Sequence, residues 1–78
     1  MSIRLSFSGQ LLQYRTQHRM TQKRMAEICD LSLRQYQNLE LGHSLPSFEK
    51  GIQIAALLDL SLDALKLEIA EELTPVQE

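Results

Sequence analysis

The sequence predicts an all-α fold, a compact bundle of five helices. Apolar residues recur at helical spacing, and each of five such segments begins with a serine or threonine that can cap a helix. At 78 residues the chain has room for one domain. Its composition, 44% hydrophobic and 23% charged residues, is typical of a folded globular protein. We therefore expect a single helical domain.

The chain lacks the features of membrane and exported proteins. Its longest apolar run, Ile54–Leu58, is far shorter than the ~20 residues that a membrane-spanning helix needs. The first 15 residues have neither the continuous apolar core nor the small-residue cleavage site of a secretory signal. The single cysteine, Cys29, cannot form an internal disulfide and is expected to be a small core residue. We expect a cytoplasmic protein.

Five capping residues place the starts of the five predicted helices. They are Ser8, Thr21, Ser32, Ser47 and Ser61. Four of these starts also have an apolar pair that flanks the cap as a hydrophobic staple, namely Phe7–Leu12, Met20–Met25, Leu31–Tyr36 and Leu60–Leu65. The third start adds a capping box between Ser32 and Gln35. The first helix is expected to end near residue 18, the fourth near residue 58 and the fifth near residue 73.

These helices define a domain over residues 8–73, preceded by an arm (1–7) and followed by a frayed acidic tail (74–78). In the arm, Ile3, Leu5 and Phe7 alternate with polar residues, a period of two that suits a strand. No second strand is predicted in the chain. The arm therefore either pairs with another copy or remains a disordered or packed extension.

Only residues 29–32 separate the second and third helices, so these two helices must meet at a sharp angle. Ala26 supplies the small side chain that a close crossing needs. Gly42 follows the third helix and can take the left-handed conformation that ends it. The second and third helices are therefore expected to form a helix-turn-helix, with the third over residues 33–41.

The third helix has a polar face that the core does not explain. At ~100° per residue, Tyr36 and Leu39 mark the buried side. The opposite side carries Arg34, Asn38 and Leu41, with Gln37 beside them and Leu33 on the margin. Arginine can pair with guanine, amides can bracket adenine, and an apolar side chain can contact the thymine methyl. The alternative is an ordinary solvated helix face.

The charge distribution favours an anionic partner for one half of the molecule. The net charge of −2 conceals six basic and two acidic residues in positions 1–38, a net of +4, and two basic and eight acidic residues in positions 39–78, a net of −6. Such an asymmetry predicts one surface for phosphate and another for a different contact. Arg19, Lys23 and Arg24 are the candidate phosphate contacts beside the third helix.

A longer pattern then resembles a known family. The stretch MTQKRMAEICDLSLRQYQNLELGHSLPS is similar to the DNA-binding domain of phage-repressor-like regulators, the Cro/repressor or XRE type of bacterial and phage transcription factors. The resemblance runs from about Leu11 to Leu65. The matching positions are Thr21, Gln22, Ala26, Leu31, Ser32, Tyr36, Leu39, Glu40, Gly42, Pro46, Ser47 and Leu60 to Asp63.

The resemblance implies a role for each matching site residue. Base contacts would come from Leu33, Arg34, Gln37 and Asn38. Phosphate contacts would come from Gln22, Arg19, Lys23, Arg24, His43 and Ser44. Gln22 would also steady the first base-contacting residue. Arg15 and Glu40 would form a partly buried ion pair that ties the first helix to the end of the third.

The sequence departs from the family pattern at a few positions. Asp30 stands where the family usually has glycine, and a left-handed backbone there would cost ~1 kcal/mol. Leu33 replaces a usually polar residue and is expected to meet a thymine methyl or to make no base contact. Gly51 weakens the fourth helix, and the loop His43–Leu45 lacks lysine and arginine. These departures predict modest affinity and a dependence on dimerisation.

We therefore expect a small, repressor-like transcriptional regulator that binds double-stranded DNA sequence-specifically as a homodimer, in the cytoplasm and on the nucleoid when bound. Candidates for the dimer surface are Ile3, Leu5, Leu67 and Ala70. The alternative is a protein-interaction module, an antitoxin or antirepressor that uses its acidic half. No cofactor, metal site or catalysis is expected, because His18 and His43 lack partners at metal spacing and no activated nucleophile or glycine-rich phosphate loop is present.

Overall fold

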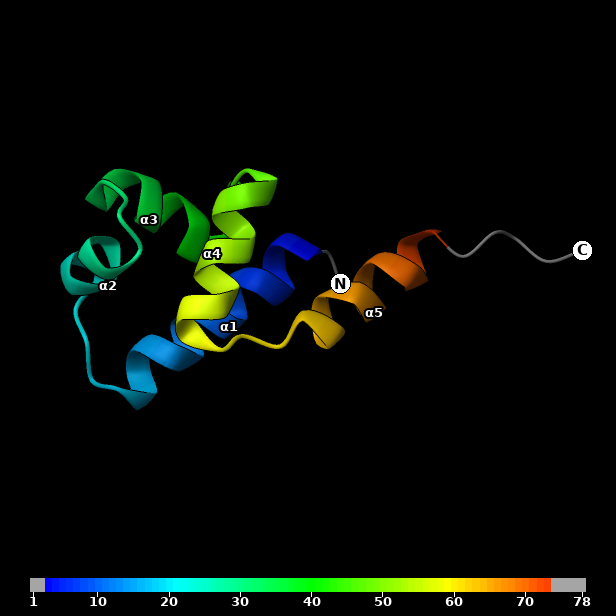
Figure 1. Cartoon of the computed structure of the whole chain (residues 1–78), viewed down its shortest axis with the longest axis horizontal. Helices are drawn as coiled ribbons and strands as arrows, with labels where there is room; N and C mark the ends of the chain where they lie inside the picture. Colours follow the sequence, from blue (N-terminus) through cyan, green and yellow to red (C-terminus); the bar gives the residue numbers. More distant parts are fainter. Residues whose placement is uncertain (1–2, 74–78) are drawn as a thin grey trace, which may run out of the picture.

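The computed structural model describes residues 3–73, and the side chains of residues 3–70. The predicted acidic tail (74–78) lies outside the described residues. Five helices follow one another: α1 (Ile3–Gln17), α2 (Gln22–Ile28), α3 (Leu33–Glu40), α4 (Phe48–Leu58) and α5 (Leu62–Leu73). No strand occurs between residues 3 and 73. The all-α, five-helix prediction is confirmed, with α2 and α3 as the helix-turn-helix. Figure 1 shows α1 to α4 gathered together, while α5 extends toward one end of the molecule.

The start of α1 corrects the sequence prediction. The helix begins at Ile3, five residues before the expected cap Ser8, so residues 3–7 of the predicted arm are helical rather than extended. Ser8 is buried, and its hydroxyl donates to the Leu5 carbonyl at 3.1 Å. Phe7 and Leu11 are both buried, four residues apart, and Ile3 continues the same helical stripe. Burial along this helical stripe stabilises a helix more than the alternating pattern of Ile3, Leu5 and Phe7 favours a strand. The Phe7–Leu12 staple is not made, since Leu12 is exposed.

The other caps form where they were predicted. The Thr21, Ser32 and Ser47 side chains accept hydrogen bonds from the backbone N–H groups of the third residue of each helix. The capping box of Ser32 and Gln35 is complete. Ser61 accepts from the Ala64 N–H at 3.2 Å. Caps of this kind satisfy N–H groups that have no partner within the helix, so they fix where each helix begins.

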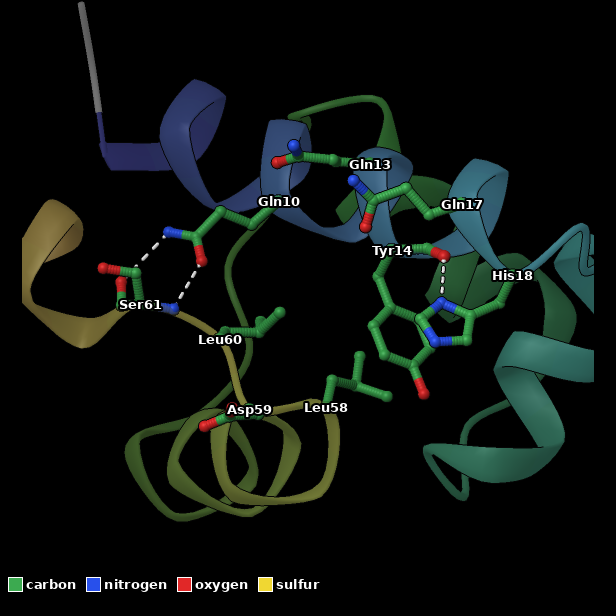
Figure 2. Close-up of a pocket in the computed structure, with 9 residues that line it drawn as sticks. All are labelled: Gln10, Gln13, Tyr14, Gln17, His18, Leu58, Asp59, Leu60 and Ser61. Atoms are coloured by element: carbon green, nitrogen blue, oxygen red, sulfur yellow. Dashed lines mark hydrogen bonds between the residues drawn. The ribbon is translucent and has the colours of Figure 1, made fainter.

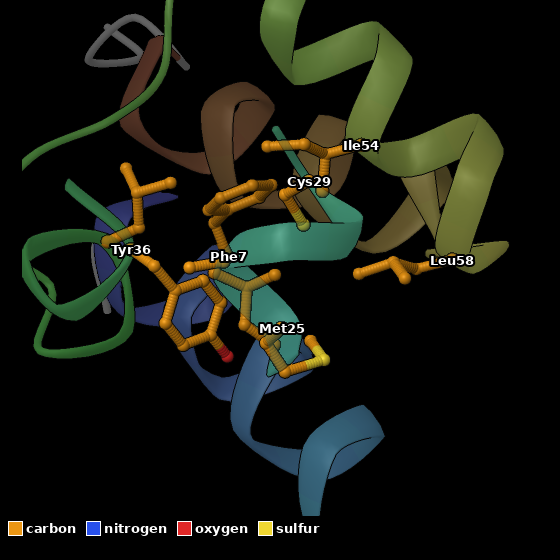
Figure 3. Packing of buried hydrophobic residues seen from close by; sticks show 9 residues of the cluster. Phe7, Met25, Cys29, Tyr36, Ile54 and Leu58 are labelled. Carbon is orange, nitrogen blue, oxygen red and sulfur yellow. The ribbon is translucent and has the colours of Figure 1, made fainter. Parts of the chain in front are cut away.

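The core lies between α1, α2, α3 and α4. Its largest fully buried side chains are Tyr36, Leu11, Met25 and Ile54. Figure 3 shows the Tyr36 ring pointing into the cluster beside Phe7 and Met25. Tyr36 and Leu39 were the predicted inner side of α3, and both are buried. Ala26 and Cys29 are buried as well, and burial raises the pKa of the Cys29 thiol.

Two left-handed residues bracket α3. Asp30, in the turn before it, has φ +55°, and Gly42, after it, has φ +77°. A Cβ at Gly42 would lie 3.2 Å from the Leu5 side chain, so both the conformation and the close approach to α1 favour glycine. At Asp30 the left-handed conformation is strained, because an aspartate in this conformation carries a steric cost that glycine avoids.

Asp30→Gly is therefore expected to raise the free energy of unfolding by up to ~1 kcal/mol, a melting temperature higher by about 4–8 °C for a domain of this size. Urea and thermal melts would measure it. Asp63→Gly is the matched control: Asp63 lies in the first turn of α5 and has no positive φ, so glycine there should destabilise. If the Asp30→Gly variant were less stable than the parent, the left-handed backbone at Asp30 would not be strained.

Candidate nucleic-acid interface

Helix α3 packs against the core with one side and exposes the other side to solvent. Tyr36 and Leu39 anchor its inner side in the core. On the outer side, Arg34 is exposed, and so are the apolar residues Leu33 and Leu41. Gln37 and Asn38 are half-buried at the two edges of this outer side. The helix thus presents a mixed polar and apolar surface that does not contribute to the packing of the core.

Arg15 and Glu40, the expected ion pair, lie in direct contact. Arg15 Nε is 2.8 Å from Glu40 Oε2, and Arg15 Nη2 is 3.0 Å from Glu40 Oε1. The Glu40 side chain is 7% exposed and that of Arg15 23%. Arg15 also donates to the Met20 carbonyl at 3.2 Å. A bidentate arrangement of this kind fixes geometry as well as charge, so it joins α1, the α1–α2 link and the end of α3.

Two more donors complete the surroundings of Glu40. The Tyr36 hydroxyl donates to Oε2 at 2.5 Å, and Gln22 Nε2 donates to Oε1 at 3.0 Å. Burial would raise the pKa of Glu40, but the hydrogen bonds from Arg15, Tyr36 and Gln22 outweigh it, so this pKa lies below its ordinary value of 4.5. Burial raises the pKa of Tyr36, and its bond to Glu40 adds to the shift. Glu40 therefore stays ionised and Tyr36 stays neutral at neutral pH.

Gln22 continues this network to the outer side of α3. Its Oε1 accepts a hydrogen bond from Gln37 Nε2 at 3.1 Å. Gln22 was expected to steady the first base-contacting residue, Leu33, but the structure joins it to Gln37, one turn later. Leu33 has no polar group to accept such a contact. Gln37 and Glu40 are three residues apart and share one face of the helix, which is the sequence signal that could have indicated the link.

The candidate phosphate contacts are exposed but differ in their surroundings. Arg19 lies in the link between α1 and α2 with φ +54°, and Lys23 lies exposed on α2. Arg24 lies 3.6 Å from Glu27 in an exposed pair. Such a pair contributes little to stability and leaves the guanidinium accessible to a phosphate.

The loop after α3 brings two further site residues close to the helix. The His43 backbone N–H donates to the Asn38 carbonyl at 2.9 Å, which closes the end of α3. Asn38 and Ser44 line one groove of about 380 Å³ between α3 and this loop. Lys50 lines the same groove, and its Nζ donates to the Cys29 carbonyl at the end of α2 at 3.3 Å. Lys50 was not among the predicted site residues, because nothing in the spacing of the sequence indicates this long-range contact.

A second hollow, of about 470 Å³, lies away from these residues, between α1 and the α4–α5 link. Figure 2 shows Gln10 of α1 facing Ser61, with Nε2 donating to the Ser61 carbonyl at 3.1 Å and Oε1 accepting from the Ser61 N–H at 2.7 Å. The His18 ring stacks on Tyr14 with centroids 4.0 Å apart. The hydrogen bonds between Gln10 and Ser61 connect α1 to the residue before α5. The hollow therefore serves contacts within the chain and is separate from the outer side of α3.

The candidate dimer residues are divided between two helices. Ile3 and Leu5 lie on α1, and Leu67 and Ala70 lie on α5. Leu5 and Leu67 are exposed, whereas Ile3 is half-buried and lines an apolar groove with α4 and α5. The structure therefore brings Ile3 to a different surface from the one that the exposed Leu67 offers.

Comparisons with known proteins agree with this geometry. A family model described as helix-turn-helix, of the phage-repressor-like type, matches residues 11–65, well over half of the chain. Neither the search of curated proteins nor the search of solved structures gave a match. In the described part of the chain, none of the helices is long and apolar enough to cross a membrane.

Proposed function

The chain belongs to the phage-repressor-like helix-turn-helix family, a family of DNA-binding domains rather than enzymes, and from that premise we propose that it is a sequence-specific transcriptional regulator. Helix α3 enters the major groove of double-stranded DNA, and α2 lies across the phosphate backbone. Two copies bind a palindromic operator whose half-sites are about one helical turn, ~34 Å, apart. Occupation of the operator then represses transcription.

One observation carries this proposal: the hydrogen-bonding groups on the outer side of α3 are left over by the fold. On the inner side, Tyr36 and Gln22 already donate hydrogen bonds to Glu40. Among the described residues, the side chains of Arg34 and Asn38 have no hydrogen-bond partner, and Gln37 is already positioned by Gln22. We assign Arg34 to guanine, the amides of Gln37 and Asn38 to adenine, and Leu33 to a thymine methyl.

Phosphate contacts fix the position of the protein on the duplex. We assign them to Gln22, Arg19, Lys23, Arg24, His43 and Ser44, which lie in the α1–α2 link, on α2 and in the loop after α3. Such contacts provide affinity without sequence preference. The scarcity of charge on α3 is then no obstacle, because the basic residues next to it supply the attraction.

The second candidate function is a protein-interaction module, an antitoxin or antirepressor. The net charge of −6 in residues 39–78 favours it, since this half repels DNA. Under this alternative, changes on the outer side of α3 would leave partner binding intact. The variant of Arg34 and Asn38 described in the Discussion separates the two functions.

Selection from random DNA duplexes at two salt concentrations tests the proposal. We expect an enriched palindrome, and an affinity that falls with salt at a logarithmic slope of about −4 per protomer, because about four phosphates are neutralised. The slope would be measured by titrating the selected duplex over several salt concentrations. An affinity that does not change with salt would contradict DNA binding, and salt-dependent binding without enrichment would contradict sequence specificity.

A further inference from the structure

An apolar groove opens beside the loop that follows α3. It has a volume of about 330 Å³ and is lined by residues of the start of α1, of the start of α4 with the loop before it, and of α5. Its lining is almost entirely apolar and includes Ile3, Phe7, Phe48, Ile52, Leu65 and Ile69. None of the base-contacting residues lines it. Leu45, Pro46 and Ser47 also line the groove that contains Asn38, so the two grooves adjoin at the loop after α3.

Exposed apolar side chains surround this groove. Phe48 is 87% exposed, and Leu45, Ile52 and Leu62 are each 40–48% exposed. Together these four offer about 400 Å² of apolar surface, comparable to the largest patch on a typical monomer, where such patches are often functional. Phe48 is the most exposed large hydrophobic residue of the described chain. Burial against a partner would remove this surface from water.

The groove and its surroundings have the shape that a two-fold interface needs. In such an interface the same patch faces itself, so it must carry both a projecting group and a recess that receives it. Phe48 projects from the first turn of α4, and Gly51, in the next turn, lines the groove beside it without a side chain. We propose that a second copy of this chain docks here, each Phe48 entering the recess of its partner. This inference rests on the proposed function and identifies the surface that forms its homodimer.

Charge and size also favour a second copy over an unlike partner. Glu49 follows Phe48, and Lys66 lines the groove from α5, so the rim carries both signs of charge. Neither residue takes part in an ion pair within the described chain. A two-fold axis would bring Glu49 of one copy toward Lys66 of the other. The apolar patch is about half of the ~800 Å² that each partner buries in a standard interface, so the dimer is weak alone and is reinforced when two half-sites hold both copies.

Sedimentation of the full chain without DNA, from micromolar to millimolar concentration, tests the interface. We expect a monomer–dimer equilibrium in which Phe48→Ser raises the dissociation constant at least about ten-fold, as loss of a central aromatic anchor does. Gly51→Ala should raise the melting temperature, because alanine favours a helix, yet weaken the dimer by filling the recess. Leu57→Ser is the matched control: Leu57 lies on α4, is 54% exposed and does not line the groove, so dimerisation should not change.

Charge exchange provides a second readout. Glu49→Lys should weaken the dimer, and combining it with Lys66→Glu should restore it. A Phe48→Ser variant that dimerises as the parent does, or a parent that stays monomeric at millimolar concentration, would overturn the interface. Neither result touches sequence-specific DNA binding, which the selection experiment measures separately. Conversely, dimers that depend on Phe48 with no enriched operator would overturn the proposed function and leave this interface standing.

Discussion

Replacing Arg15 with methionine is expected to lower the free energy of unfolding by up to about 3–5 kcal/mol, the range for breaking a fully buried ion pair by removing one partner, because Arg15 is 23% exposed. Methionine keeps most of the length of the side chain but removes both hydrogen bonds to Glu40, whose side chain is 7% exposed. A carboxylate then remains buried without its cation. In a domain of 78 residues this loss is a large part of the total stability, and urea unfolding would measure it.

Arg24→Met is the matched control, since it removes the cation of the exposed pair with Glu27. There the two side chains are 63% and 57% exposed and 3.6 Å apart, so little stability should be lost. Equal effects of Arg15→Met and Arg24→Met would contradict a structural role of the Arg15–Glu40 pair.

The pH dependence of the Arg15→Met effect has a defined sign. In the parent protein the pKa of Glu40 is lowered by folding, so its contribution to stability is full above its ordinary value of 4.5 and is lost as the pH falls toward the lowered value. The variant no longer has most of this contribution. The difference in stability between parent and variant should therefore narrow below about pH 4.5. A constant difference across this range would contradict the assignment.

Replacing both Arg34 and Asn38 with alanine is expected to remove operator preference. Each bidentate contact to a base discriminates by about 1–3 kcal/mol, so the affinity for the selected operator should fall to near that for random DNA. Both side chains lack a hydrogen-bond partner in the described chain, so stability should change little. Titration of the operator and a scrambled duplex at one salt concentration would measure the ratio of affinities.

A matched pair of substitutions, Arg4→Ala with Gln53→Ala, removes the same charge from exposed positions on α1 and α4. It should leave the ratio of affinities unchanged. If the Arg34 and Asn38 variant kept its operator preference, the assignment of α3 as the base-contacting helix would be wrong. If it lost DNA preference but still bound a protein partner, the protein-interaction function would gain support.

The parts of the fold that depend on local signals could be predicted from the sequence. Capping serines and threonines act within one turn of the chain, so Thr21, Ser32 and Ser47 marked helix starts correctly. The inner side of α3 followed from helical spacing. The helix start predicted at Ser8 was wrong, because residues 3–7 fit both the strand period of two and the spacing of a helix. Burial of Phe7 and Leu11 in the core favours the helix. Cap chemistry alone could not show that the helix had begun five residues earlier.

Long-range contacts were predictable only where the family resemblance supplied them. The resemblance implied that Arg15 and Glu40 pair, although 25 residues separate them. It did not imply that Gln22 would join Gln37, or that Lys50 would reach the end of α2, because these contacts depend on the angles between helices. The apolar groove was missed for the same reason, since its walls come from three separate helices.

The link from Glu40 through Gln22 to Gln37 has a consequence for how this protein can evolve. Positions 33, 34 and 38 face outward without hydrogen bonds to the core, so they can change with the operator at little cost to folding. Gln37 is different, because its amide satisfies Gln22, which in turn donates to the buried carboxylate. Under the proposed function, a new residue at position 37 would alter DNA preference and stability together. New operator specificities should therefore arise first at positions 33, 34 and 38, with glutamine retained at position 37.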